Sequence, residues 1–231
     1  PLVFKNQILD EIILSHFHLI CKLSDLKDWE KSVVERALNP RHKVTIALVG
    51  KYISLQDSYK SIYESLVHAG IENDTRVEIK KVDSEDIDKH GPERFLKSVS
   101  GILVPGGFGY RGIEGKIKAI RFARKNKIPF LGLCLGMQCA VIEFAREPCG
   151  LGEANSTEFK PKAKHPVISL LEEQRKVKDL GGTMRLGVYP CKIKKNTLAF
   201  RLYKKALIHE RHRHRYEFNN KYRKILEKKG M

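Results

Sequence analysis

The chain has 231 residues, 42% of them hydrophobic, which is enough for one large domain or for one domain with an appendage. Its net charge of +17 is typical of nucleic-acid-binding proteins, but the lysines and arginines are spread along the chain and no DNA- or RNA-binding motif accompanies them. No apolar run approaches the ~18 residues of a membrane span, and the start lacks a signal-peptide pattern. We therefore expect no nucleic-acid partner and no membrane segment.

The first 40 residues have the pattern of a helical appendage. Apolar residues at helical spacing predict one helix over residues 9–17 and another over residues 29–38. Ser24 and Asp25 are candidate N-caps of the second helix, which should end at Asn39 and Pro40. Two short helices with little core between them favour a linker or the tail of a preceding domain. Because the sequence starts at Pro1 rather than methionine, we expect it to be part of a longer chain.

From residue 43 onward, apolar strands alternate with amphipathic helices. The expected strands cover residues 44–50, 77–82, 101–105 and 128–133. The expected helices run from the candidate caps Asp57 or Ser58 to Gly70, over residues 95–99 and 115–126, and from residue 135 onward. This alternation predicts an α/β fold, with an open, mostly parallel sheet that has helices on both faces.

The alternation weakens after Pro148. Residues 167–171, 184–193 and 207–215 are expected as strands of an antiparallel part. Residues 222–230 are expected as a helix that ends at a glycine.

Cys134 stands between Gly132 and Gly136, where the predicted strand passes directly into a helix. Gly-x-Cys-x-Gly is the cysteine form of the nucleophile elbow, in which small neighbours allow a strained strand-to-helix turn to close. The N–H groups and the dipole of the helix N-terminus favour the thiolate over the thiol. The alternative is a buried, unreactive cysteine, which is our interpretation of Cys139. The elbow by itself does not distinguish hydrolases, peptidases and amidotransferases.

Cysteine catalysis also requires a base, and no histidine stands in a convincing motif for one. The candidates are His42, His68, His90, His165 and the histidines of residues 209–214. The five cysteines of the chain are odd in number and lack the paired spacing of metal ligands, so we expect no metal site in this chain. The odd number and unpaired spacing of these cysteines also favour a reduced, cytoplasmic setting.

Residues 105–112, Pro-Gly-Gly-Phe-Gly-Tyr-Arg-Gly, follow a predicted strand and contain four glycines. Loops after the carboxyl ends of parallel strands form the ligand crevice of such sheets. A phosphate loop is one interpretation, although the Gly-x-x-x-x-Gly-Lys-Ser/Thr pattern is absent. An oxyanion hole is the better interpretation, because a thiol that attacks a carbonyl needs N–H donors near the developing negative charge. A flexible turn remains the alternative.

Two polar stretches leave more than one interpretation open. Residues 155–159 are typical of a surface turn, although Glu158 could accept a hydrogen bond from a substrate ammonium group. As a strand, residues 209–215 would place His212 and His214 on one face and Arg211, Arg213 and Arg215 on the other. A basic edge strand, an anion site built from arginine, and a metal site that these arginines would disfavour all fit this pattern.

The longer strings resemble one family. They are Gly50-Lys-Tyr52 with Asp57-Ser-Tyr59, residues 104–112, residues 132–138, Ala154-Asn-Ser-Thr-Glu-Phe159, residues 179–187 and residues 210–217. Together they resemble the CTP synthase family, whose C-terminal domain is a class I, triad-type glutamine amidotransferase. The resemblance implies a flavodoxin-like glutaminase domain over residues 43–231. Residues 1–42 would then be the tail of the synthetase domain and the interdomain linker.

The resemblance also implies a site. Cys134 would attack the side-chain amide of glutamine, and the backbone N–H groups of Gly107 and Leu135 would hold the oxyanion. The matching glutamine-binding positions are Gly107, Leu135, Gly136, Met137, Gln138, Glu158 and Arg215. Ammonia would pass to the synthetase domain, which aminates UTP with ATP and Mg²⁺. GTP would act as an allosteric activator, with Phe108 and Arg111 as candidate GTP-linked residues, and the full-length protein would be a homotetramer.

One feature of the family is missing from this sequence. The His-Pro-Glu motif, which supplies the base in the family, does not occur in these residues. We expect that the chain is truncated before that segment. The stretch from Glu172 to Lys178 is also shorter than the resemblance implies. The alternative is a catalytically silent regulatory or assembly domain of the same fold.

Overall fold

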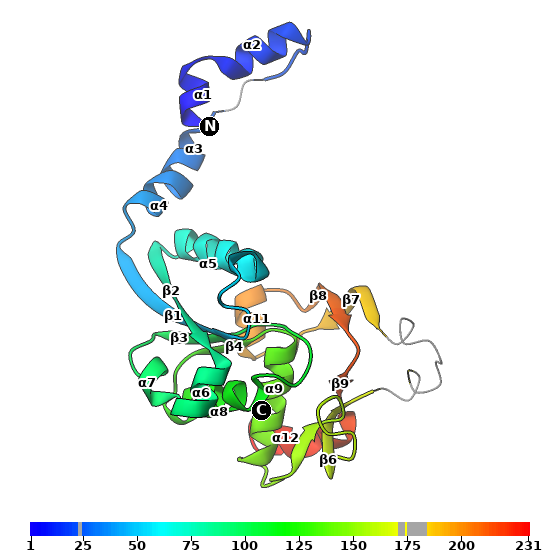
Figure 1. The fold of residues 1–231 in the computed structure, drawn as a ribbon. Helices are drawn as coiled ribbons and strands as arrows, with labels where there is room; N and C mark the ends of the chain where they lie inside the picture. Colours follow the sequence, from blue (N-terminus) through cyan, green and yellow to red (C-terminus); the bar gives the residue numbers. More distant parts are fainter. Residues whose placement is uncertain (23–24, 171–173, 175–183) are drawn as a thin grey trace. The chain divides into compact units, whose positions relative to one another are not determined.

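The structure is a computed structural model that describes residues 1–22, 25–170, 174 and 184–231 (Figure 1). These residues form two compact units. The first consists of residues 1–46 and 55–80, and the second of residues 47–54 and 81–231. Three predictions touch residues outside the described ranges, namely the N-cap at Ser24, the strand end at Leu171 and the string that starts at Asp179.

The first unit contains the predicted helices of the appendage. Its elements are α1 (Leu2–Asn6), α2 (Leu9–His16), α3 (Lys27–Trp29), the π-helical stretch η1 (Glu30–Glu35), α4 (Arg36–Leu38), η2 (Gln56–Tyr59) and α5 (Lys60–Glu72). Both expected helices are confirmed, and α1 is an additional one. No residue of α1 to α4 is buried, as expected for a segment with little core of its own. Asp25 accepts a hydrogen bond from the N–H of Lys27 (3.0 Å).

Helix α5 corrects two expectations. Asp57 and Ser58 do not cap it but lie in the preceding 3₁₀ turn η2. The helix also continues through Gly70 to Glu72. A Cβ at Gly70 would lie 2.5 Å from the carbonyl oxygen of Thr75, so this glycine allows the helix to pack against the next strand rather than ending the helix.

The main sheet has the strand order β2-β1-β3-β4. Its strands are β1 (His42–Gly50), β2 (Thr75–Asp83), β3 (Gly101–Val104) and β4 (Phe130–Gly132). Strands β3 and β4 run parallel, with Ile102 opposite Phe130 and Val104 opposite Gly132. Every residue of β3 is buried, as expected for a parallel strand covered on both faces. The predicted α/β fold is confirmed.

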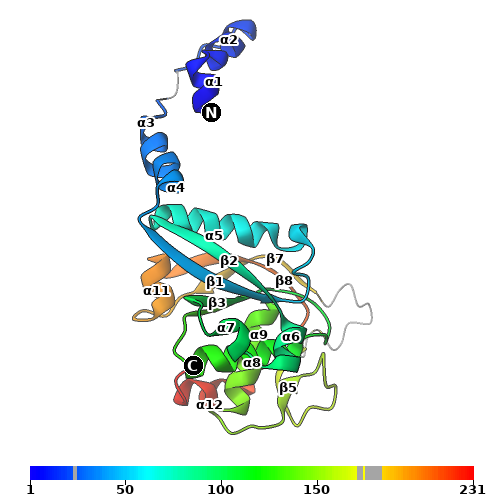
Figure 2. The same ribbon diagram turned by 60° about the vertical axis from the view of Figure 1, so that its left-hand side comes forward.

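Four helices of the second unit cluster together near β3 (Figure 2). They are α6 (Ser84–His90), α7 (Glu93–Leu96), α8 (Ile113–Lys125) and α9 (Leu135–Arg146). Helix α7 starts after Pro92 and ends before Val99, whereas the sequence predicted a helix over residues 95–99. Helix α6 was not predicted, because its seven residues contain one apolar side chain, Ile87, and therefore show no periodicity.

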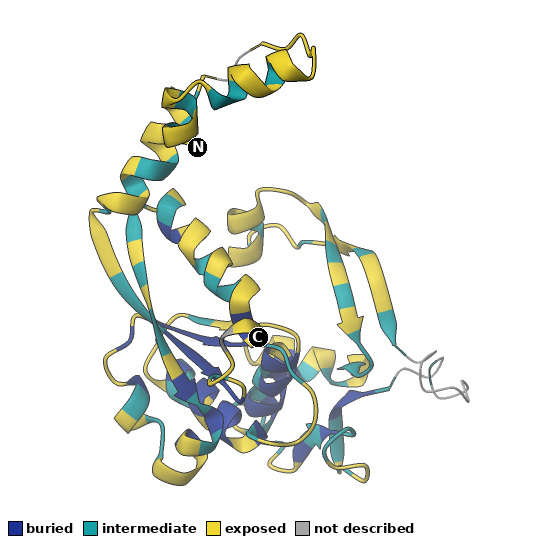
Figure 3. Cartoon of the chain, turned by 45° about the horizontal axis from the view of Figure 1, so that its top comes forward, coloured by how far each residue is buried: buried dark blue, intermediate teal, exposed yellow. Residues whose placement is uncertain are grey.

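The core of the second unit lies between these helices and the strands (Figure 3). Ile117, Ile120 and Ala123 of α8 are buried there, as predicted. Gly115 faces α6 so closely that a Cβ would lie 1.7 Å from the carbonyl oxygen of Ser84. This glycine is therefore required by packing between two helices.

In the described residues, the C-terminal part forms two small sheets and three short helices. Strand β5 (Ala154–Ser156) pairs parallel with β6 (His165–Ser169), and β6 pairs antiparallel with β9 (Glu217–Phe218). Strands β7 (Arg185–Lys192) and β8 (Leu207–His214) form an antiparallel hairpin. The helices are α11 (Leu198–Tyr203), η4 (Asn220–Tyr222) and α12 (Arg223–Lys228).

Most expectations for this part are confirmed, including the antiparallel hairpin and the last helix, which is followed by Gly230 at a φ of 96°. The loop expected over residues 155–159 is partly wrong, because Asn155 and Ser156 belong to β5. Two polar residues in a three-residue strand leave no apolar pattern to detect. None of the described helices is long and apolar enough to cross a membrane.

Candidate active site

The strand-to-helix turn at Cys134 is formed as the sequence predicted. Strand β4 ends at Gly132 and α9 begins at Leu135. Cys134 between them has a φ of 52° and a ψ of −107°, a strained backbone conformation for a residue with a side chain. A Cβ at Gly132 would lie 2.6 Å from the carbonyl carbon of Gly136, and a Cβ at Gly136 would lie 2.1 Å from the carbonyl oxygen of Val104. The turn therefore requires glycine on both sides of Cys134.

One pocket brings together side chains from distant parts of the second unit. Six of its lining residues were predicted from the sequence as site residues: Gly107, Phe108, Cys134, Gln138, Glu158 and Arg215. His214, one of the histidines considered above as a base, also lines it, as do Met184 and Tyr216, which were not predicted to do so. A thiol, a carboxylate and a guanidinium group thus share one small pocket, which is a suitable set for a polar substrate with an ammonium and a carboxylate group.

The glycine-rich loop lies directly against the elbow. A Cβ at Gly106 would be 3.4 Å from the Cβ of Cys134 and 4.0 Å from its sulfur. The N–H of Gly109 donates a hydrogen bond to Oε1 of Glu158 (3.1 Å). The loop after β3 and the turn after β4 therefore meet at the carboxyl ends of neighbouring strands, where ligands bind in sheets of this class.

The electrostatic surroundings of the Cys134 thiol differ from the expectation. Although part of Cys134 faces solvent, burial by the surrounding protein raises the pKa of its thiol above the ordinary 9.0. A hydrogen bond from the backbone N–H of Leu135 lowers this pKa, and the negative charge of Glu158 raises it. The helix N-terminus acts in the predicted direction, but burial outweighs it and the net shift of the pKa favours the thiol.

Comparison with known proteins identifies the family. Residues 54–230 match the family model described as "Glutamine amidotransferase class-I". The chain belongs to the class I glutamine amidotransferase family. Its curated relatives include CTP synthase from Carboxydothermus hydrogenoformans, which is 57% identical over 231 residues, and CTP synthase from Caldanaerobacter subterraneus, which is 55% identical. All of this chain is covered in both matches, but it spans only 43% of the length of either relative.

A solved structure agrees with this assignment. The glutaminase domain of CTPS from Trypanosoma brucei with bound acivicin superposes with a TM-score of 0.75 and 39% sequence identity. The match covers 81% of this chain and 72% of that one. The resemblance to the CTP synthase family is therefore confirmed, and this chain corresponds to the glutaminase part of its relatives.

Not every position that matches this amidotransferase family lines the pocket with its side chain. The side chain of Leu135 is buried in the core, and Gly136 packs against β3. Met137 is exposed outside the pocket lining. Arg111 is also outside it, and its guanidinium group lies 3.4 Å from a carboxylate oxygen of Glu85.

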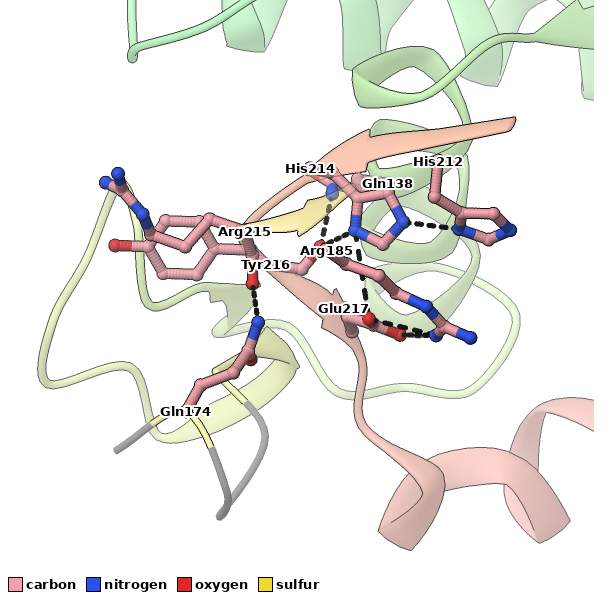
Figure 4. A network of polar contacts seen from close by, with 8 residues as sticks. All are labelled: Gln138, Gln174, Arg185, His212, His214, Arg215, Tyr216 and Glu217. Carbon is pink, nitrogen blue, oxygen red and sulfur yellow. Dashed lines mark hydrogen bonds and ion pairs between the residues drawn. The ribbon is translucent and has the colours of Figure 1, made fainter. Parts of the chain in front are cut away.

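Side-chain amides hold the backbone that carries Arg215. Nε2 of Gln138 donates to the carbonyl oxygen of Tyr216 (2.9 Å), and Nε2 of Gln174 donates to that of Arg215 (2.9 Å) (Figure 4). Gln138 is buried on α9, four residues after Cys134. It therefore links the position of the Cys134 helix to that of Arg215.

The predicted pairing of His212 and His214 on one strand face is confirmed. Nδ1 of His212 and Nε2 of His214 are 2.8 Å apart, and Nδ1 of His214 is 3.1 Å from the carbonyl oxygen of Tyr216 (Figure 4). Arg185 pairs with Glu217 beside them (2.9 Å). Burial and the charge of Arg185 lower the pKa of His212. Among the described residues, no group of three or more His, Cys, Asp or Glu side chains is placed to hold a metal ion.

A larger and more open hollow lies within the first unit. Its lining consists mainly of charged side chains of α3, η1 and the end of α5. Several of these are engaged with their neighbours, as in the ion pair of Arg41 with Asp74 (2.8 Å). No cysteine or histidine is among its lining residues, so it offers no nucleophile or base for catalysis.

Proposed function

We propose that this chain is the glutaminase part of a CTP synthase. In this proposal residues 43–231 form the glutamine amidotransferase domain. Residues 1–42 form the tail of the synthetase domain and the interdomain linker. The observation that carries the proposal is the pocket in which Cys134, the glycine-rich loop, Glu158 and Arg215 meet.

The charges of the pocket match an amino-acid substrate. Glu158 would accept hydrogen bonds from the α-ammonium group of glutamine, and Arg215 would bind its carboxylate. The side-chain amide would then extend toward Cys134. The backbone of the matching positions from Leu135 to Gln138, and that of Gly107, would complete the binding of the substrate.

The reaction would proceed through a thioester. The sulfur of Cys134 forms a bond to the amide carbon, and the negative charge moves to the oxygen, which accepts hydrogen bonds from the N–H groups of Gly107 and Leu135. When this intermediate collapses, the carbon–nitrogen bond breaks and the nitrogen leaves as ammonia after it gains a proton. Water then attacks the glutamyl thioester, which releases glutamate and restores the thiol.

The raised pKa of the Cys134 thiol means that this reaction requires a base. The family resemblance assigns that role to the histidine of a His-Pro-Glu motif, which these 231 residues do not contain. The histidine would take the thiol proton and transfer it to the departing nitrogen.

The ammonia would be used by a synthetase domain of the same polypeptide for the ATP-dependent amination of UTP to CTP in pyrimidine nucleotide biosynthesis. We place ATP and Mg²⁺ in that domain, as the resemblance to the CTP synthase family implies. GTP would activate the glutaminase step, with Phe108 and Arg111 as candidate contacts. The complete enzyme would be a cytoplasmic homotetramer.

Covalent labelling with an electrophilic glutamine analogue tests the proposal. The full-length protein and the 231-residue chain are treated with the analogue, and the labelled peptide is identified by mass spectrometry. We expect labelling of Cys134 in the full-length protein, protection by glutamine, and no labelling in Cys134→Ala. Cys191→Ala is the matched control, because Cys191 is also exposed but is not part of the pocket.

The same experiment separates the alternative, a catalytically silent domain of the same fold. If the analogue leaves Cys134 unlabelled in the full-length protein while iodoacetamide modifies it, the thiol is accessible but does not react with a glutamine-like electrophile. That result would reject the glutaminase assignment in favour of the silent domain.

A further inference from the structure

Two buried lysines lie beneath the glycine-rich loop. Lys51, directly after β1, is 8% exposed, and Lys116 of α8 is 0% exposed. A Cβ at Gly107 would lie 3.7 Å from Cε of Lys51 and 3.9 Å from Nζ of Lys116. The loop therefore rests directly on both side chains. Neither lysine belongs to the set of residues assigned to catalysis or glutamine binding above.

Of the two, only Lys51 is hydrogen-bonded to the loop. Its Nζ donates to the carbonyl oxygen of Phe108. Conversely, the guanidinium group of Arg111 in the loop donates to the carbonyl oxygen of Lys51 (3.4 Å). The segment after β1 and the loop after β3 are thus joined by two hydrogen bonds, one donated by each segment. Within the described part of the chain, Nζ of Lys116 has no hydrogen-bond partner.

The contact of Lys51 involves one peptide group in particular. The carbonyl of Phe108 and the N–H of Gly109 belong to the same planar peptide unit. The carbonyl oxygen accepts a hydrogen bond from Lys51, and the N–H donates to Glu158. A cationic amine and an anionic carboxylate therefore hold this peptide at its two ends, and hydrogen bonds to charged groups are the stronger ones.

The two hydrogen bonds of this peptide, to Lys51 and to Glu158, would not remain equally strong during the proposed reaction. When Glu158 binds the ammonium group of glutamine, its negative charge is shared between that group and the N–H of Gly109, so its hydrogen bond with this N–H is weaker. Lys51 is not among the residues that line the pocket, so its bond to the Phe108 carbonyl would be retained when glutamine binds. Lys51 would then be the main side chain that fixes the orientation of this peptide and, through it, that of Gly107, which lines the same pocket as Cys134.

We propose that Lys51 is a positioning residue for the glutaminase reaction, acting through the Phe108 carbonyl to hold the Gly107 N–H toward the oxyanion. This inference rests on the proposed function. It assigns to Lys51 no contact with substrate and no transfer of a proton. An oxyanion donor stabilises the transition state rather than the bound substrate. Loss of the Lys51 contact should therefore lower kcat far more than it changes KM.

The test compares variants of the full-length protein. Lys51→Met removes the donor and keeps the aliphatic chain, Lys51→Gln keeps a shorter uncharged donor, and Lys51→Arg keeps a charged donor. Lys118→Met is the matched control, because Lys118 is an exposed lysine of α8 that pairs with Asp88 away from the pocket. For each protein we would measure kcat and KM for glutamine hydrolysis and the rate at which iodoacetamide alkylates Cys134.

The alkylation rate distinguishes a positioning role from a general structural defect. Alkylation by iodoacetamide requires the thiolate but forms no oxyanion, so it does not depend on the direction of the Gly107 N–H. We expect Lys51→Met to lower kcat by about 100-fold, with KM and the alkylation rate changed by less than about threefold. Lys51→Arg should recover most of kcat, and Lys51→Gln should be intermediate.

Two outcomes would overturn the inference. A kcat of Lys51→Met within about threefold of wild type would show that the loop keeps its orientation without the lysine. Equal losses of kcat and of alkylation would show that Lys51 acts on the thiol or on folding. If Lys51→Met does not fold, the other two variants test the same inference. The value of kcat should then decrease from wild type to Lys51→Arg to Lys51→Gln. Failure of the proposed function is distinct, because wild-type protein would then hydrolyse no glutamine.

Discussion

Replacing Lys116 by methionine should stabilise the protein at neutral pH. The Lys116 side chain is completely buried on α8, and in the described part of the chain its Nζ makes no hydrogen bond. Burial lowers the pKa of this amine from the ordinary 10.5, and the positive charge of Lys51 also lowers it. The charge of Asp83 acts in the opposite direction but is outweighed. The amine is therefore in an environment that disfavours its charged form.

The size of the effect follows from two opposing contributions. A buried polar group without a hydrogen bond destabilises a protein by about 1–3 kcal/mol. Methionine keeps the unbranched apolar chain and a high helix propensity, but its side chain is one atom shorter. The resulting gap of about 20 Å³ costs about 0.5 kcal/mol at 24 cal/mol per Å³. We expect a net gain of about 0.5–2.5 kcal/mol, or about 1–10 °C in Tm for a protein of this size.

The gain should depend on pH in a defined direction. Because the folded-state pKa is below 10.5, the unfolded state binds more protons than the folded state between these two values. The stability of wild type therefore rises with pH across that window, whereas the methionine variant lacks this contribution. The advantage of Lys116→Met is largest below the folded-state pKa and shrinks as the pH approaches 10.5.

Urea unfolding of wild type and variant, followed by far-UV circular dichroism between about pH 7 and pH 10, measures both effects. Lys118→Met is the matched control on the same helix, where loss of an exposed ion pair should change stability by about 0–1 kcal/mol in the unfavourable direction. The reasoning is refuted if Lys116→Met is less stable than wild type at pH 7, because the amine would then have a favourable partner. An advantage that stays constant up to pH 10 would refute the titration argument.

Three further predictions concern the elbow, its helix and the thiol. Gly136→Ala should lower stability by more than about 3 kcal/mol in urea unfolding, because the new Cβ would lie 2.1 Å from the carbonyl oxygen of Val104. An unchanged unfolding midpoint would contradict this prediction. Glu143→Ala should cost about 1–3 kcal/mol in the same assay, because it removes a buried carboxylate that accepts three hydrogen bonds from Arg124, and a neutral result would show that the pair contributes nothing. In the 231-residue chain, the rate at which iodoacetamide alkylates Cys134 should still rise with pH above 9, because the pKa of this thiol is raised, and a plateau below pH 9 would disprove the shift.

Several parts of the site could be predicted because they depend on local sequence. The elbow requires glycine at Gly132 and Gly136, and both requirements are visible as a spacing around Cys134. The buried strand β3 and the helix α8 could be recognised from apolar runs and periodicity. Each of these patterns lies within one segment and depends only on the residues of that segment, so it can be recognised from the sequence.

Other parts depend on residues far apart in the chain. Gly109 and Glu158 are 49 positions apart, and Gln138 and Tyr216 are 78 apart, yet both pairs are hydrogen-bonded. No local pattern predicts such contacts, because they arise where separate elements meet in space. The family resemblance indicated that Glu158 and Arg215 belong to the same site. From the local sequence alone, Glu158 could equally lie in a surface turn and Arg215 on a basic edge strand.

The sequence alone determined the strained turn at Cys134 and the α/β order of the elements, since both follow from glycine geometry and from the periodic burial of apolar side chains. Only the tertiary structure decided the state of the thiol and the contacts of the buried lysines. The helix N-terminus acts on Cys134 as predicted, but burial outweighs it. Lysine is usually a surface residue, yet Lys51 and Lys116 are buried, and the glycine-rich loop lies against both side chains. Desolvation depends on everything that surrounds a group, so it is a property of the folded chain rather than of any one segment.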